Sequence, residues 1–181
     1  HYTLVSALGH GRAATLEALQ NDRTGLAARP FETAQLDTWL GVVDEADTIV
    51  LPGALASFDC RNNRLAELGL RADGFGDAVR AAASCWGAHR VGVFLGTSTA
   101  GILQTEVAYR DRDPATGALP PWLHYGHTHN TYSVSAYVRA ALEHARTLGA
   151  RTCIVACSPP APEIAEAADV AIVPITGPEV V

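Results

Sequence analysis

The stretch RTCIVACSPPAPEIAEAADVAIVPITGPEVV, residues 151–181, alternates between predicted strands and a predicted helix. RTCIVAC (151–157) is a short continuous apolar run, which is typical of a buried strand. APEIAEAAD (161–169) has the composition of a short helix, and VAIVPI (170–175) predicts a second strand. Strands that alternate with helices predict an α/β fold with a mainly parallel sheet.

The same alternation continues upstream. Residues 1–26 predict a strand, a glycine-rich turn and a helix, and TWLGVV (38–43) predicts another short strand. Apolar residues at helical spacing predict helices within four ranges: 59–70, 73–87, 97–110 and 131–149. We expect Asp59 to cap the first of these helices, and Gly87 and Gly149 to end the second and the last. RVGVFLG (90–96) is expected to be a buried strand, and 111–130 a long polar loop.

The composition is that of a folded globular domain, with 48% hydrophobic and 18% charged residues among 181. The formal net charge is −6 and the arginines are mostly isolated, which argues against a nucleic-acid surface, since phosphate binding needs clustered Lys and Arg. No apolar run approaches the roughly 20 residues that cross a bilayer. We therefore expect a cytoplasmic protein with no nucleic-acid or membrane partner, and with reduced cysteines at Cys60, Cys85, Cys153 and Cys157.

Residues 1–141 carry several motifs in an order that resembles the N-terminal half of a β-ketoacyl-[acyl-carrier-protein] synthase. These motifs are LVSALGHGRAATLEALQNDRTGL (4–26), FDCRNNRLAELGL (58–70), RVGVFLGTSTAGILQTEVAY (90–109) and HTHNTYSVSAYVRAAL (127–142). The resemblance implies a layered thiolase-like fold, a homodimer, and condensation of acyl thioesters presented by an acyl carrier protein. In such an enzyme a cysteine thiolate attacks the thioester, and two histidines stabilise the oxyanion.

Cys157, within Ala156-Cys157-Ser158, matches the position of the nucleophile in that family, because it follows a strand and precedes a helix. Pro159 and Pro160 depart from the family pattern, which has small polar residues there, and the preceding Gly-Pro is absent. The family's catalytic histidines lie farther downstream than this chain extends, so no histidine here is assigned to them. The alternative is that Cys157 is a small buried residue at a strand end.

From residue 137 onward the sequence resembles the sugar isomerase (SIS) domain of N-acetylmuramic acid 6-phosphate etherases. The motifs are LGA (148–150), a proline-containing loop after a strand, ADVAI (168–172) and GPEV (177–180). This resemblance accounts for Pro159 and Pro160, and implies a sugar-phosphate site near Glu179. The two resemblances meet at YVRAALE (137–143).

Gly96, Thr97, Ser98 and Thr99, in GTSTAG (96–101), are candidate substrate-binding residues. They follow a predicted strand and open a helix, which is where α/β folds place ligand contacts. The alternative is that these small residues allow a helix and a strand to pack closely. His124, His127 and His129 have no acidic or cysteine neighbour, so we expect a polar loop, no metal and no cofactor.

The simplest hypothesis is a chimera, with a synthase-like part (1–141) joined to a SIS-like tail (142–181). The ends at His1 and Val181 suggest a fragment of a longer protein. The leading functional hypothesis is acyl-thioester condensation, incomplete in this chain. The alternatives are a sugar-phosphate-binding protein of the etherase type and an inactive truncated subunit.

Overall fold

The computed structural model describes residues 1–30, 36–87, 90–91, 95–97, 99–130 and 132–144, and the strands at 153–155 and 170–172. The chain begins with two very short strands, a helix and a two-stranded ribbon. These are β1 (Val5–Ser6), β2 (Gly9–His10), α1 (Gly11–Gln20), β3 (Leu26–Ala28) and β4 (Trp39–Gly41).

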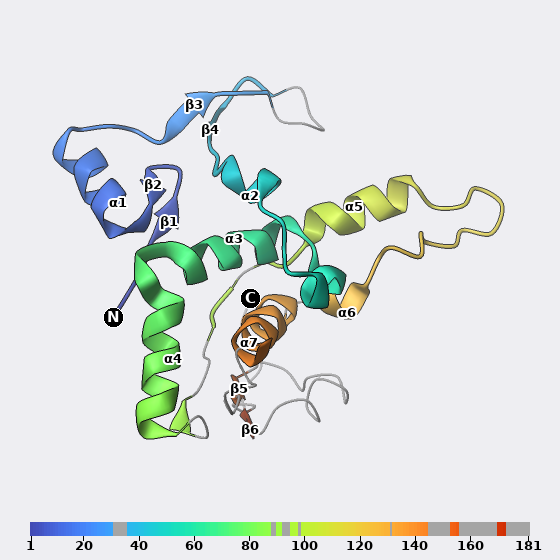
Figure 1. The fold of residues 1–181 in the computed structure, drawn as a ribbon. Coiled ribbons are helices and arrows are strands. Elements are labelled where there is room, and N and C mark those ends of the chain that lie inside the picture. Colours follow the sequence, from blue (N-terminus) through green and yellow to red (C-terminus); the bar gives the residue numbers. More distant parts are fainter. Residues whose placement is uncertain are drawn as a thin grey trace, which may run out of the picture.

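Helices dominate the middle of the chain. In order they are α2 (Glu45–Thr48), the 3-10 turn η1 (Gly53–Phe58), α3 (Arg61–Arg71), the 3-10 turn η2 (Ala72–Gly74), α4 (Phe75–Trp86), α5 (Ile102–Arg110), α6 (Tyr125–Thr128) and α7 (Ser133–His144). Figure 1 shows α3 crossing the centre of the molecule and α4 leaving its end at a steep angle. The expected helices in 1–26, 59–70, 73–87, 97–110 and 131–149 are therefore confirmed over the residues described. No helix in these ranges is long and apolar enough to span a membrane.

The described strands form three separate two-stranded sheets. β1 pairs with β2 and β3 with β4, both antiparallel, whereas β5 (Cys153–Val155) and β6 (Val170–Ile172) pair in parallel. The structure is therefore mixed α/β, but the described strands do not make the expected mainly parallel, layered sheet. One reason lies at 90–96, where Val91 and Leu95 are not in a strand and 92–94 fall outside the described residues.

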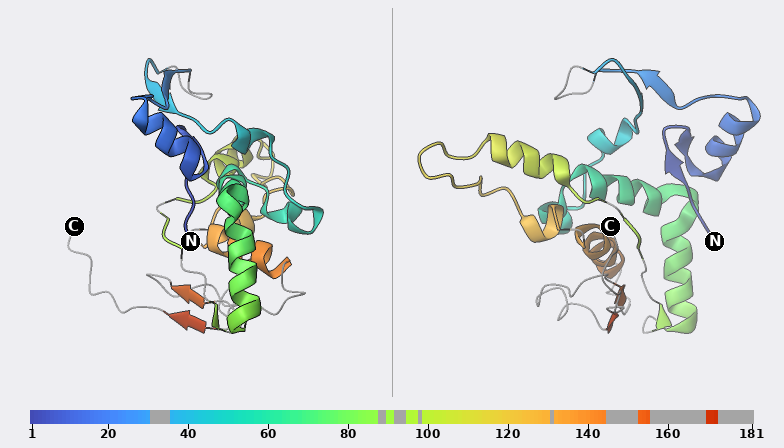
Figure 2. Two further views of the ribbon diagram at one scale, coloured as in Figure 1. Left: turned by 60° about the vertical axis from the view of Figure 1, so that its left-hand side comes forward. Right: turned by 180° about the vertical axis from the view of Figure 1, so that it is seen from behind.

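The core lies where η1, α3 and α7 meet. Leu51 and Leu55 are buried against Tyr137 and Val138 of α7. Partly buried apolar side chains surround this cluster: Phe58, Ala66, Leu70, Leu95, Ala140, Ala141 and Leu142. Figure 2 shows α7 lying beside α3, the helix that it contacts most extensively. The apolar face predicted for α7 is thus confirmed from Val134 to Leu142, and its predicted end at Gly149 lies outside the described residues.

The predicted ends of the helices have mixed outcomes. Gly87 follows α4 with a left-handed φ of 84°, as expected for a C-terminal glycine. The predicted cap at Asp59 is wrong, because α3 begins one residue later than expected, with Cys60 at its N-cap and no side-chain cap bond. The Asp59 carboxylate instead accepts two hydrogen bonds from the Arg64 guanidinium, at 2.5 and 2.6 Å. A strong bidentate ion pair thus replaces the cap.

Asp73, at the corner between α3 and α4, caps a helix that lies far away in sequence. Both of its carboxylate oxygens accept the backbone N–H of Arg12, at 3.1 and 3.0 Å, and one accepts the Thr3 hydroxyl at 3.0 Å. The N-cap residue of α1 itself, His10, makes no side-chain cap bond. Asp73 therefore stabilises the first turn of α1 and ties the N-terminal unit to the α3–α4 corner.

We expect Asp73→Ala to lower the free energy of unfolding by about 1–2 kcal/mol, through loss of this cap. Asp73 has a positive φ of 55°, a conformation that Asn tolerates better than Ala. Asp73→Asn also keeps one accepting oxygen, so it should lose clearly less stability than Asp73→Ala. Urea unfolding followed by circular dichroism measures both variants. Equal stability of Asp73→Ala and wild type would rule out the cap.

Candidate functional site

The predicted substrate-binding residues of GTSTAG fall in an exposed segment before α5. Gly96, Thr97 and Thr99 are exposed, whereas Ser98 lies outside the described residues. The Thr97 hydroxyl donates to the Thr99 carbonyl at 2.6 Å, so it supports a local turn. Gly96, Thr97 and Thr99 therefore lie together on the surface, and the Thr97 hydroxyl is already used in a local hydrogen bond.

The end of the same motif is packed tightly. Gly101, the N-cap residue of α5, donates its N–H to the Thr128 carbonyl at 2.7 Å. A Cβ atom at Gly101 would lie 2.1 Å from that carbonyl oxygen and 3.2 Å from Cβ of Cys60. Ala100 is also buried. At this end of the motif, small residues are needed for close approach, which was the alternative interpretation.

Three of the motifs noted in the sequence meet at this point. Asn62 donates from its side chain to the Thr99 carbonyl at 3.2 Å, which links 58–64 to GTSTAG. Asn63 is fully buried, and its amide donates to the carbonyls of Phe58 and His127, at 2.8 and 3.0 Å. Segments 58–64, 96–101 and 124–130 thus form one hydrogen-bonded junction. The sequence shows a run of small residues and two asparagines here, but it does not indicate which groups they bind.

The three histidines of 124–130 have separate environments. The His127 ring stacks on Phe58 with centroids 4.2 Å apart, and burial together with the nearby His124 lowers its pKa. Nδ1 of His129 lies 2.6 Å from the Thr105 hydroxyl. Within the described ranges, no group of three or more His, Cys, Asp or Glu side chains is arranged to hold a metal ion. His127 thus packs against η1, whereas His129 contacts α5 through the Thr105 hydroxyl.

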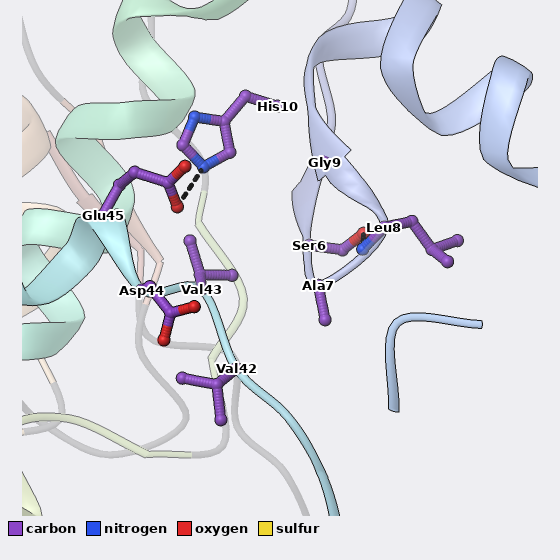
Figure 3. Close-up of a pocket in the computed structure, with 9 residues that line it drawn as sticks. All are labelled: Ser6, Ala7, Leu8, Gly9, His10, Val42, Val43, Asp44 and Glu45. Carbon is purple, nitrogen blue, oxygen red and sulfur yellow. Dashed lines mark hydrogen bonds and ion pairs between the residues drawn. The ribbon is translucent and has the colours of Figure 1, made fainter. Parts of the chain in front are cut away.

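A cavity of about 410 Å³ lies between the β1–β2 turn and the start of α2 (Figure 3). His10 and Glu45 line it and contact each other directly, with Nε2 of His10 3.2 Å from a carboxylate oxygen of Glu45 (Figure 3). The Ser6 hydroxyl accepts the backbone N–H of Leu8 at 3.2 Å. The cavity therefore offers an imidazole–carboxylate pair able to exchange a proton with a ligand, but that hydroxyl is used by the turn. This pair could not be predicted from local sequence patterns, because His10 and Glu45 are far apart in the chain.

Cys60 and Cys85 are free thiols. Cys60 is buried, and this burial raises the pKa of its thiol, against the opposing effect of the backbone N–H groups of Asn63 and Asn62. Cys85 is exposed on α4. The predicted nucleophile Cys157 and the predicted sugar-phosphate contact Glu179 lie outside the described residues.

Beyond residue 144, the described residues are those of the parallel strand pair β5–β6. Cys153, Ile154 and Val155 pair with Val170, Ala171 and Ile172 in register. Fourteen residues, 156–169, separate the two strands, which is enough for a crossover connection. Because the strands are parallel, their carboxyl ends lie at the same edge, and open α/β sheets bind ligands at that edge.

Comparison with known proteins gives one short similarity. The chain is 47% identical over 45 residues to an N-acetylmuramic acid 6-phosphate etherase of Aeromonas hydrophila. The match covers 25% of this chain and 15% of that protein, and it has the same length as the stretch 137–181. No family model and no solved structure matches the chain. The similarity supports the SIS-like interpretation of the tail, whereas the synthase resemblance of residues 1–141 stays a prediction.

Proposed function

We propose that residues 137–181 belong to a sugar-phosphate-binding unit of the SIS type, and that the ligand is a hexosamine 6-phosphate. The observation that carries the proposal is the 47% identity over 45 residues to an N-acetylmuramic acid 6-phosphate etherase. The parallel pairing of β5 and β6 supports it, because a strand, a crossover and a parallel strand form the unit that the tail's sequence predicts.

We expect the phosphate at the carboxyl ends of β5 and β6, which are Val155 and Ile172. Backbone N–H groups and small hydroxyl side chains bind phosphate well at such edges, and Ser158 follows β5 in the sequence. Glu179 carries a negative charge, so its expected contact is with the sugar hydroxyls and not with the phosphate. The similar segment covers 15% of the etherase, so the proposal for this chain is binding without turnover.

The test is a thermal unfolding series on the full chain. We expect N-acetylmuramic acid 6-phosphate and N-acetylglucosamine 6-phosphate to raise the melting temperature by several degrees at about 100 times Kd, where linkage gives roughly 2.7 kcal/mol. Unphosphorylated N-acetylglucosamine and inorganic phosphate are the controls, and each should give a smaller shift. Equal shifts with inorganic phosphate would show a general anion effect and contradict a sugar-phosphate site.

The synthase hypothesis for residues 1–141 makes a different prediction for the same protein. It expects an acyl thioester to label Cys157, with an acyl carrier protein as the carrier and a second copy of the chain as the partner. Labelling of Cys157, with no change of the melting temperature by sugar phosphates, would favour the synthase hypothesis over the sugar-phosphate one.

A further inference from the structure

A groove of about 530 Å³ lies between β4, the start of α3 and the start of α5. Its volume is within the usual range for small-molecule sites. The apolar side chains that line it are Pro30, Leu40, Val42, Ile102 and Leu103. Leu40, Val42 and Leu103 are half-buried, and Ile102 is 44% exposed, so the groove presents an apolar surface to solvent.

Among the described residues that line the groove, three are acidic and two are basic. Its two guanidinium groups are already paired: Arg29 contacts Asp44 at 2.5 and 3.0 Å, and Arg61 contacts Asp47 at 2.9 Å. Arg61 also donates to the Val43 carbonyl at 3.1 Å. Pairing holds the pKa of the Asp44 carboxyl below its ordinary value and that of Arg29 above it. Both arginines are therefore committed to protein partners.

Among the described residues, Glu106 is the remaining charged side chain that lines the groove. In the part of the chain that the structure describes, its ion-pair partner is Arg110, one turn along α5, at 3.6 Å, and both side chains are about half exposed. An ion pair with this distance and exposure contributes little to stability, so the Glu106 carboxylate stays available to a second cation. An anion would meet three carboxylates, Asp44, Asp47 and Glu106, and two arginines that are already bonded.

We propose that this groove binds an organic ammonium ion that carries an apolar chain. The ammonium group pairs with Glu106, and the chain lies along Leu40, Val42 and Leu103. The negative charge of the groove favours a cation, and its apolar lining favours a hydrophobic chain. A metal cation lacks the apolar chain, and a fatty carboxylate carries the wrong charge. The inference rests on residues within 29–110 and is independent of the function proposed for the tail.

Hexylamine and hexanoate are the probes, because they share a chain length and carry opposite charges at neutral pH. Titrated into the ¹⁵N-labelled full chain, hexylamine should shift backbone amide signals of residues 40–44 and 102–106 in a saturable manner. Hexanoate and ammonium chloride should leave these signals in place. Equal binding of hexylamine and hexanoate, or no saturable shift with hexylamine, would overturn the proposal.

Two substitutions on α5 test the role of Glu106. Glu106→Gln removes the charge with little change in shape and should weaken hexylamine binding about three- to five-fold, the value of a partly exposed ion pair. Arg110→Gln removes the competing cation and should strengthen binding. Glu17→Gln is the matched control, because Glu17 also lies on an exposed helix and pairs with an arginine, Arg23, at 3.3 Å. Unchanged binding by Glu106→Gln would contradict the placement of the ammonium group.

Discussion

We expect Gly101→Ala to lower the free energy of unfolding by about 3 kcal/mol, close to the upper end of what a single added methyl group costs. The new Cβ would lie 2.1 Å from the Thr128 carbonyl oxygen and 3.0 Å from the carbonyl carbon. Both are backbone atoms that cannot turn aside as a flexible side chain would. The clash would separate α5 from α6 and break the hydrogen bond from the Gly101 N–H to Thr128.

Gly96→Ala is the matched control, since it adds the same methyl group to the same motif. Among the described residues, apart from its two chain neighbours, no atom lies within 4 Å of a Cβ built at Gly96, so the change should be neutral or slightly stabilising. Chemical denaturation of the two variants and of wild type, followed by far-UV circular dichroism, gives the comparison. If both glycines tolerated alanine equally, the packing interpretation of Gly101 would be wrong.

The helices were predictable because their apolar residues repeat at helical spacing and their ends carry recognisable residues. Gly87 shows this, since a glycine is the common way to leave a helix through a left-handed turn. Asp59 shows the limit of the same logic. The sequence offers an acidic residue near a helix start, but in the structure its carboxylate accepts both hydrogen bonds from the Arg64 guanidinium, and Cys60 is the N-cap residue.

The sheet and the contacts between distant segments were less predictable. Local pattern indicates strands but does not specify their partners, so antiparallel β3–β4 pairing replaced the expected mainly parallel sheet among the described strands. The cap of α1 by Asp73 joins residues 61 positions apart, and the sequence near His10 contains no sign of it. The same holds for Asn63, which could be predicted to lie on a helix but not to bind the His127 carbonyl.

Candidate site residues depend on such long-range contacts even more. GTSTAG was singled out because its residues are small and follow a predicted strand, and both ligand binding and close packing need small residues. The structure separates the two ends of the motif, with Gly101 packed against Thr128 and Gly96 open to solvent. A pattern of residue types could not make that distinction, because it depends on where α6 lies.

Tyr137→Phe should lower the free energy of unfolding by about 2 kcal/mol at pH 7, the value of a hydrogen bond to a charged group. Tyr137 is fully buried between α7 and α3, and its hydroxyl donates to a Glu67 carboxylate oxygen at 2.5 Å. The other oxygen of Glu67 accepts from Arg71 at 2.7 Å. Phenylalanine keeps the ring in the core but leaves the carboxylate, only 11% exposed, with one fewer donor. Tyr125→Phe is the control, since Tyr125 is 58% exposed and its loss of a hydroxyl should matter little.

The pH dependence of the same pair gives a second readout that simple loss of packing would not produce. Burial, and then the hydrogen bond to Glu67, raise the pKa of the Tyr137 hydroxyl far above its ordinary value near 10. The folded protein therefore keeps this proton at a pH where the unfolded chain loses it. The stabilisation by Tyr137 is fully present below about pH 10 and is lost as the pH rises above it. Urea unfolding of wild type and Tyr137→Phe should accordingly show a constant difference from pH 7 to 9 that shrinks by pH 11. A difference that stays constant through pH 11 would mean that Tyr137 ionises equally in both states.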